Sequence, residues 1–384
     1  MTAQQASPSA SPGASPISGE GAGWRTVEER EITVDGQPVL LSPDGRWLAG
    51  SGPEDSFCVW EVATLDAACD GEGLAIRPET ITWAPDSSAV AFSLNAVQLL
   101  TDSDLYVFEV AARELRNLTD DGIDDLNLFG DDTEEPILID DVPAWSPDGA
   151  SLVFARTRWD PAGRQGTVLA RIDRVGGEAE TLFAVELNLP FAVYSLIKWL
   201  EGDRLLYSLL LPDVEDERNG LWTAGLDASD ARQLLPGDST AEVPAPWLTD
   251  VSPDGRTASI YSRVKQTESV GESEVHYLLD LESGELTAIT TGEEPLVRVT
   301  TPPRFSPDGA SLVYAVIQGN DYVLVVHDLQ SGETGALVND VNLGGADSTP
   351  VVLSHGLDWA ENDTVLIPSG SASVLVTLEP DPTS

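Results

Sequence analysis

Apolar residues in this chain gather in short runs that are separated by polar turns. Typical runs are AVAFSL (89–94), SLVFAR (151–156) and SLVYAV (311–316). Apolar or alternating runs of roughly four to eight residues between Gly, Pro, Asp and Ser are typical of β-strands, whereas an amphipathic helix needs a longer pattern with a period near 3.6. No convincing amphipathic helix is found, so the pattern predicts an all-β protein.

The strand pattern repeats along the chain. The eight residues SPDGASLV occur twice, at 146–153 and at 306–313. Five looser copies begin at Leu40, Thr82, Lys198, Asp250 and Asp358. A large apolar residue precedes each turn: Leu41, Trp83, Trp145, Trp199, Val251, Phe305 and Trp359. These positions are 42 to 62 residues apart. Pro, Asp and Gly in this order suit the last three positions of a type I turn, so each copy predicts a hairpin.

Two further strand-like runs follow each hairpin. In the second copy they are DLYVFEVA (104–111) and RELRNLT (113–119). Each copy therefore predicts a four-stranded antiparallel sheet with two apolar faces, which is stable only when neighbouring sheets cover both faces. Seven such sheets in a ring form a β-propeller.

The predicted propeller takes up residues 23–384 as one domain. Its blades are expected to start near residues 37, 79, 141, 193, 246, 300 and 353. The last copy lacks a fourth strand, and the unassigned segment 23–34 is expected to supply that strand and close the ring. Residues 1–22 are rich in Ser, Ala, Pro and Gly, which predicts a disordered tether. No signal peptide is recognised, so we expect either an exported protein whose signal was removed or a cytoplasmic one.

The repeated turn resembles that of the TolB-type propeller family, whose repeats carry the same W/F-S-P-D-G turn before an apolar strand. The motif is also similar to that of the propellers of prolyl oligopeptidases and tricorn-type proteases. The resemblance covers about residues 35–380, and four copies keep Ser-Pro-Asp-Gly intact. It implies the fold and little about activity, because the family includes assembly proteins, gating domains and a few enzymes.

The charge of the chain narrows the choice of partners. Asp and Glu number 65 against 20 Lys and Arg, for a net charge of −45. Such a surface repels nucleic acid and anionic membranes and attracts cations and basic proteins. The alternative interpretation is that the charge serves solubility or adaptation to salt. No apolar stretch is long enough for a membrane helix, so no membrane insertion is expected.

Charged residues at one repeated position are the main candidates for a binding site. The residue before each large apolar residue should lie on the innermost strand, close to the ring axis. These residues are Leu40, Thr82, Ala144, Lys198, Asp250, Arg304 and Asp358. The last four alternate in sign over consecutive blades. Two interpretations stay open: ion pairs that hold the inner strands together, or a polar channel that binds a small ligand or a peptide tail.

Metal sites have weaker support. The segment 120–141 holds ten carboxylates and no basic residue, and its oxygens could bind calcium. The candidate ligands are Asp124, Asp125, Asp131 and Asp132, although a solvated acidic loop is the default interpretation because no DxDxDG pattern is present. Some TolB-like propellers are polysaccharide lyases that use a histidine-bound metal. The three histidines of this chain, His276, His327 and His355, do not obviously converge, so structural roles are expected for them.

The two cysteines, Cys58 and Cys69, are eleven residues apart. In an exported protein they are expected to form a disulfide between neighbouring strands, and otherwise they are two buried thiols. No nucleophile-elbow motif, G-x-S-x-G, is present, and seven blades leave no room for a hydrolase domain.

These observations predict a non-enzymatic binding or scaffold propeller, exported and tethered at the cell surface or in the envelope. It is expected to be a monomer that binds a protein partner, a basic one fitting its charge best. No catalytic residue and no cofactor are expected, with calcium as the exception that the acidic loops leave open. The alternative is a metal-dependent lyase or hydrolase whose site lies in the central channel.

Overall fold

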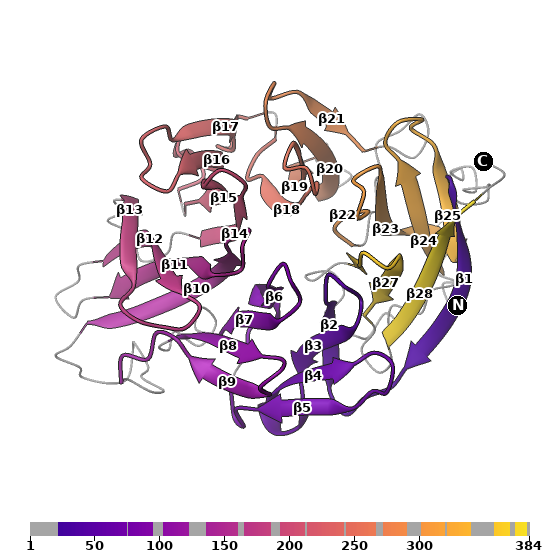
Figure 1. Ribbon diagram of the computed structural model, residues 1–384. Coiled ribbons are helices and arrows are strands. Elements are labelled where there is room, and N and C mark those ends of the chain that lie inside the picture. The colour runs from indigo at the N-terminus through magenta and orange to yellow at the C-terminus, as the bar shows by residue number, and fades with distance from the viewer. Residues whose placement is uncertain are drawn as a thin grey trace, which may run out of the picture.

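Seven four-stranded antiparallel sheets stand around a ring in the computed structural model (Figure 1). The residues that the structure describes are 22–74, 76–94, 103–122, 136–159, 165–185, 193–211, 213–241, 243–265, 272–289, 301–318, 321–338, 357–368 and 373–381. The prediction of an all-β, seven-bladed propeller is confirmed. No helix in these ranges is long and apolar enough to cross a membrane.

Each blade runs in chain order from the ring centre outwards. Blade 1 holds β2 (Gln37–Leu41), β3 (Trp47–Ser51), β4 (Phe57–Glu61) and β5 (Ala67–Asp70). Blade 2 holds β6 (Thr82–Trp83), β7 (Ala89–Ser93), β8 (Leu105–Glu109) and β9 (Glu114–Asn117). Blade 3 holds β10 (Ile137–Trp145), β11 (Ser151–Trp159), β12 (Gln165–Asp173) and β13 (Glu180–Val185). Two short 3-10 helices, η1 (Pro53–Asp55) and η2 (Pro78–Thr80), are found in connections.

Blades 4 to 6 follow the same order, and blade 7 takes its outermost strand from the N-terminal end of the chain. Blade 4 holds β14 (Val193–Leu200), β15 (Arg204–Leu210), β16 (Gly220–Gly225) and β17 (Arg232–Pro236). Blade 5 holds β18 (Trp247–Val251), β19 (Thr257–Lys265), β20 (Glu272–Asp280) and β21 (Leu286–Ala288). Blade 6 holds β22 (Arg304–Phe305), β23 (Ser311–Gln318), β24 (Asp321–Asp328) and β25 (Thr334–Val338). Blade 7 holds β26 (Asp358–Trp359), β27 (Thr364–Ile367), β28 (Ser373–Pro380) and β1 (Trp24–Ile32).

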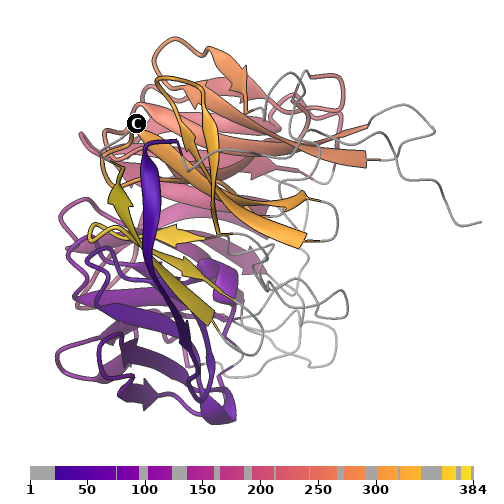
Figure 2. The ribbon, with the colours of Figure 1, turned by 90° about the vertical axis from the view of Figure 1, so that its right-hand side faces the viewer.

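Strand β1 closes the ring from the other end of the chain. It pairs antiparallel with β28, from Trp24 opposite Pro380 to Ile32 opposite Ser373. Both views show the indigo β1 running beside the yellow β28 (Figures 1 and 2). The Trp24 ring packs edge-on against Trp359 with centroids 5.0 Å apart, and its Nε1 donates to Ser311 Oγ of blade 6 at 3.3 Å. The prediction that the segment 23–34 completes the seventh blade is confirmed.

The repeated Ser-Pro-Asp-Gly stretch is the turn between the first and second strands of a blade. In blade 3, Ser146 Oγ donates to Asp148 Oδ1 at 2.6 Å, and the backbone N–H of Ala150 donates to the same carboxylate oxygen at 3.0 Å. Gly149 has a φ of +67°, a conformation that costs glycine little. The serine hydroxyl and the backbone amide lower the pKa of Asp148. The aspartate therefore organises the turn, as does its repeat Asp308 with Ser306.

Seven clusters of buried apolar side chains hold neighbouring blades together, one at each boundary. Trp145 illustrates the arrangement at the boundary of blades 2 and 3. Its side chain packs with Ala91 and Phe154, its Nε1 donates to the carbonyl of Thr82 at 3.1 Å, and the Arg174 guanidinium lies 5.6 Å from the ring centroid. The large residue before each turn thus belongs to the core between blades.

The structure also places part of the acidic segment 120–141. Strand β10 begins at Ile137, so residues 137–141 belong to a strand rather than to a loop. The reason is their apolar content, Ile-Leu-Ile, which continues the strand pattern back from the turn. Asp124, Asp125, Asp131 and Asp132 lie outside the described residues.

Cys58 and Cys69 lie opposite each other on β4 and β5. Their sulfur atoms are 1.96 Å apart in a disulfide that joins the third and fourth strands of blade 1.

Candidate functional site

The innermost strands bring the seven repeated positions around the ring axis. In the view along the ring, β2, β6, β14, β18 and β22 are innermost (Figure 1). Blades 1 to 3 contribute the uncharged residues Leu40, Thr82 and Ala144. Blades 4 to 7 contribute Lys198, Asp250, Arg304 and Asp358, all half-buried. One side of the ring centre is therefore neutral, and the other carries two positive and two negative groups.

Two of the four charged side chains accept hydrogen bonds from the next blade. Asp250 Oδ2 accepts from the backbone N–H of Phe305 in blade 6 at 3.0 Å. Asp358 Oδ2 accepts from the backbone N–H of Leu41 in blade 1 at 2.9 Å. Each carboxylate thus joins its own inner strand to that of its neighbour, and the second bond crosses the point where the ring closes.

Arg304 joins the blades on both of its sides. Its Nε donates to the carbonyl of Leu357 in blade 7 at 3.0 Å, and its Nη1 donates to the carbonyl of Thr249 in blade 5 at 2.8 Å. The same nitrogen lies 3.7 Å from Asp250 Oδ1. Charged hydrogen bonds of this kind are stronger than neutral ones, so Arg304 stabilises the ring.

Lys198 differs from the other three. No hydrogen bond or ion pair of its ammonium is found among the described residues, although Asp250, Arg304 and Asp358 are close enough to act on its charge. Burial lowers the pKa of Lys198, the carboxylates of Asp250 and Asp358 oppose this shift, and the Arg304 charge adds to it. Lys198 is thus a partly desolvated cation whose donors are not taken up by the ring.

Asp358 carries a raised pKa. Burial raises the pKa of Asp358 to about 6, and the Arg304 charge and the Leu41 N–H limit that rise. A carboxyl whose pKa is higher in the folded than in the unfolded chain stabilises the fold at low pH, and this stabilisation is lost as the pH rises through about 6.

We expect Asp358→Asn to remove that dependence. The amide oxygen can still accept from the Leu41 N–H, but the group no longer ionises. Relative to the parent, the variant should gain about 2 kcal/mol of unfolding free energy between pH 4.5 and pH 7.5. Urea unfolding across this range measures the gain. Asp148→Asn is the matched control, because the lowered pKa of Asp148 confines its effect to lower pH; an equal gain in both variants would contradict the assignment.

A second charged network lies between blades 2 and 3 and was not predicted. Arg156 donates to both oxygens of Asp140 at 2.7 and 2.6 Å, and Arg77 pairs with Asp141. Asp104, which accepts from Asn117 Nδ2 at 2.7 Å, has its pKa raised to about 6 by burial. Asp140 and Arg156 face each other across the hairpin. The pair could have been predicted by extending both strands of the hairpin away from the Ser-Pro-Asp-Gly turn and matching the residues that face each other.

The two histidines in the described part of the chain, His276 and His327, lie on different blades. His276 on β20 is buried, with its ring 5.7 Å from that of Tyr261, and burial lowers its pKa to about 4. His327 on β24 has its Nδ1 2.8 Å from Thr334 Oγ1, and burial lowers its pKa. His355 lies outside the described residues. Within the described ranges, no three His, Cys, Asp or Glu residues form a group that could hold a metal ion.

Comparisons with known proteins support the fold. No protein-family model matches the sequence, and no curated protein is similar to it in sequence. An oligogalacturonate lyase solved with manganese is 14% identical, with a TM-score of 0.64 over 92% of this chain and 98% of that one. A second oligogalacturonate lyase, from Vibrio parahaemolyticus, is 15% identical, with a TM-score of 0.63 over 95% of this chain and 100% of that one. TolB from Acinetobacter baumannii is 13% identical, with a TM-score of 0.47 over 83% of this chain and 64% of that one.

The manganese of that lyase raises the question whether this chain has a matching site. His327 Nδ1 is engaged by Thr334, whereas His276 Nδ1 is buried without a hydrogen-bond partner among the described residues, and these residues hold no group of three ligands around either ring. The described part of the chain therefore does not fit a histidine-held metal. What the two oligogalacturonate lyases share with this chain is the β-propeller fold.

Proposed function

We propose that this chain is a non-enzymatic binding propeller whose ring centre receives an acidic group of its ligand. The observation that carries the proposal is the contrast within the ring centre. Asp250, Arg304 and Asp358 form hydrogen bonds with the backbones of neighbouring blades, whereas the Lys198 ammonium has no partner among the described residues. A partly desolvated cation without a partner is costly, and a carboxylate from a ligand would offset that cost.

The ligand class follows from these surroundings. A single ammonium flanked by two carboxylates binds one small anionic group, such as the carboxyl terminus of a peptide, and repels a polyanion. The neutral residues Leu40, Thr82 and Ala144 would contact the uncharged remainder of the ligand. Peptides and proteins with a free carboxyl terminus are therefore the proposed class.

The setting of the protein is part of the proposal. The Cys58–Cys69 disulfide favours an oxidising compartment outside the cytoplasm, and the segment 1–22 would act as its tether. With a net charge of −45, a partner protein with a basic surface would associate fastest. We propose a monomer, because the propeller is closed by its own N-terminal strand.

Short peptides test the role of Lys198. We expect peptides with a free C-terminal carboxylate to bind more tightly than the same peptides with an amidated end, and Lys198→Met to abolish the difference. Isothermal titration calorimetry measures both affinities. Lys265→Met, which changes the only other lysine of the chain, is the control and should bind as the parent does. Equal binding of free and amidated peptides by the parent would contradict the proposal.

A metal-dependent lyase is the alternative. It is favoured by the two oligogalacturonate lyases, whose folds match over nearly the whole of this chain. A lyase reaction leaves a carbon–carbon double bond in its product, which absorbs ultraviolet light. Incubation of the protein with oligogalacturonate and Mn²⁺ tests this alternative: a rise in absorbance would establish it, and no rise is expected for a binding propeller.

A further inference from the structure

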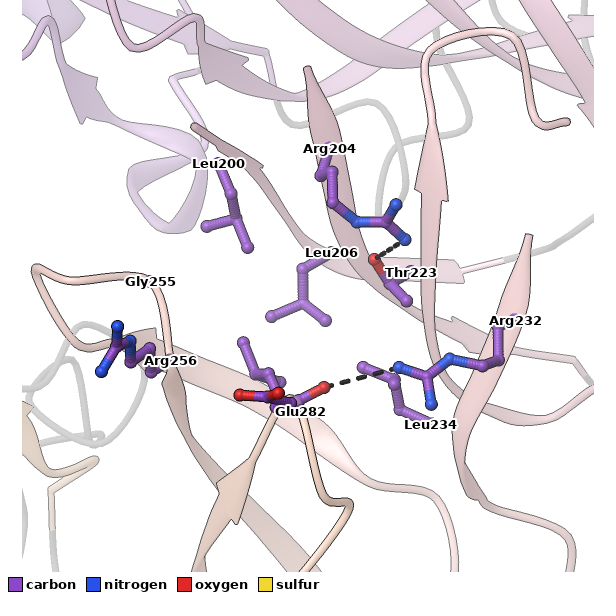
Figure 3. A pocket seen from close by; sticks show the side chains of 10 residues that line it. Leu200, Arg204, Leu206, Thr223, Arg232, Leu234, Gly255, Arg256 and Glu282 are labelled. Atoms are coloured by element: carbon purple, nitrogen blue, oxygen red, sulfur yellow. Dashed lines mark hydrogen bonds between the residues drawn. The ribbon is translucent and has the colours of Figure 1, made fainter. Parts of the chain in front are cut away.

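A cleft of about 370 Å³ lies between blades 4 and 5, away from the ring centre (Figure 3). Gly255 and Arg256 of its lining belong to the Ser-Pro-Asp-Gly turn of blade 5, so the cleft opens on the face that carries these turns. Leu200 and Arg204 line it from the matching turn of blade 4. A volume of this size is typical of sites for small ligands.

Two repeated positions at this boundary hold smaller residues than at the boundary of blades 2 and 3. At the boundary of blades 2 and 3, Trp145 fills the space before the turn and the Arg174 guanidinium covers it. The matching residues of blade 5 are Val251 and Leu281; the Leu281 N–H donates to the carbonyl of Arg256 as the Arg174 N–H donates to that of Ala150. A valine and a leucine fill less space, and the core between blades 4 and 5 reaches the surface there.

Leucines form the apolar part of the cleft. Leu200, Leu206, Leu234 and Leu281 line it, and all four belong to the apolar cluster between blades 4 and 5. Leu206 is fully buried, while the other three are partly exposed. An apolar group placed here would extend an existing core rather than rest on an isolated patch.

Arginines form the polar part. Three of the chain's 20 basic residues, Arg204, Arg232 and Arg256, line the cleft against one acid, Glu282. Arg204 is engaged by Asp230 at 2.5 Å and by Thr223 at 3.2 Å. Arg232 Nη2 donates to the carbonyl of Leu281 over a long distance, 3.5 Å. The Arg256 side chain is 79% exposed, and its Nε lies 4.0 Å from Asp254 Oδ2. Two guanidiniums thus keep donors for a ligand.

We propose that this cleft binds a small amphiphilic anion, an aliphatic chain that ends in a carboxylate. The chain would lie on the leucines, and the carboxylate would accept hydrogen bonds from Arg232, while the charge of Arg256, on the opposite side of the cleft, adds to the attraction (Figure 3). Guanidinium groups suit carboxylates because their paired N–H donors match the two oxygens. On a surface with a net charge of −45, two arginines with donors to spare beside an apolar hollow favour an anion with an apolar tail over a sugar or a cation.

Fatty acids of graded length test the proposal on the full chain. We expect octanoate to bind with one site per chain by isothermal titration calorimetry, more tightly than hexanoate, and acetate and 1-octanol to bind far more weakly. The variant Arg232→Gln/Arg256→Gln should weaken octanoate binding at least tenfold. Both side chains are on the surface, so the variant should fold as the parent does.

Two controls locate the site. Arg46 stands at the same position of the Ser-Pro-Asp-Gly turn in blade 1, with its guanidinium 5.9 Å from the Trp47 ring, and Arg46→Gln should leave octanoate binding unchanged. Octanoate should not compete with a peptide that carries a free C-terminal carboxylate, which separates this cleft from the ring centre. The proposal is overturned if octanoate does not bind, if acetate binds as tightly as octanoate, or if the double arginine variant binds as the parent does.

Discussion

Removal of residues 23–34 is expected to prevent the ring from closing and to leave little folded protein. These residues include β1, which pairs with β28 along eight positions and buries Ile32 in the core between blades 7 and 1. Without them, β28 becomes an unpaired edge, and Trp359 loses its contact with Trp24. The lost burial and pairing together approach the whole stability of an ordinary domain, about 5–15 kcal/mol.

Circular dichroism and urea unfolding of the purified protein measure this effect. Removal of residues 1–20, which the sequence predicts to be a tether, is the matched control and should leave the unfolding midpoint where it is. A protein that lacks residues 23–34 and still unfolds cooperatively at the parent's midpoint would contradict closure of the ring by β1.

Trp145→Ala is expected to lower the unfolding free energy of the whole ring by about 3–5 kcal/mol. The indole is 6% exposed, fills the boundary between blades 2 and 3 and donates to the carbonyl of Thr82 in the neighbouring blade. Its removal leaves a cavity and breaks that hydrogen bond between the two blades. Because every blade depends on its two neighbours, the loss should appear in a single transition rather than in local opening.

Trp145→Phe is the informative companion variant. It keeps most of the apolar contact but lacks the indole N–H, so about 1–2 kcal/mol should be lost. Equilibrium unfolding in urea, followed by tryptophan fluorescence, compares the two variants. If Trp145→Ala unfolds at the parent's midpoint, the tryptophan does not hold the two blades together.

The repeat made the fold predictable because its turn has specific chemistry. A serine, an aspartate and a glycine with a positive φ mark four of the seven hairpins, and the spacing of the seven copies counts the blades. Closure by the segment 23–34 followed from the missing strand of the last copy. The first strand of blade 3 was harder to place, because residues 137–141 combine strand-like isoleucines with the carboxylates of an acidic segment.

The candidate site was predictable in position but not in the role of each residue. Lys198, Asp250, Arg304 and Asp358 were singled out as one set, and two interpretations were left open for it: ion pairs between the inner strands, or a polar channel that binds a ligand. The carboxylates and Arg304 mainly bond backbone groups of neighbouring blades, such as the Leu41 N–H and the Leu357 carbonyl. Contacts between a side chain and the backbone of another blade cannot be predicted from the spacing of residues in the sequence. The cleft between blades 4 and 5 was not predicted either. It depends on how fully the side chains fill the boundary between the two blades, and the repeat pattern does not give this.

The division of roles at the ring centre is tested most directly by the unfolding free energies of Lys198→Met and Arg304→Met, measured in parallel in urea. Arg304→Met removes the charged hydrogen bonds to the carbonyls of Leu357 and Thr249 and should cost about 3 kcal/mol. Lys198→Met removes a partly desolvated cation that has no partner in the described part of the chain, and it should change the unfolding free energy by less than about 1 kcal/mol, or raise it. Equal losses of about 3 kcal/mol in both variants would mean that Lys198 holds the ring together as Arg304 does, and would contradict its assignment as the binding residue.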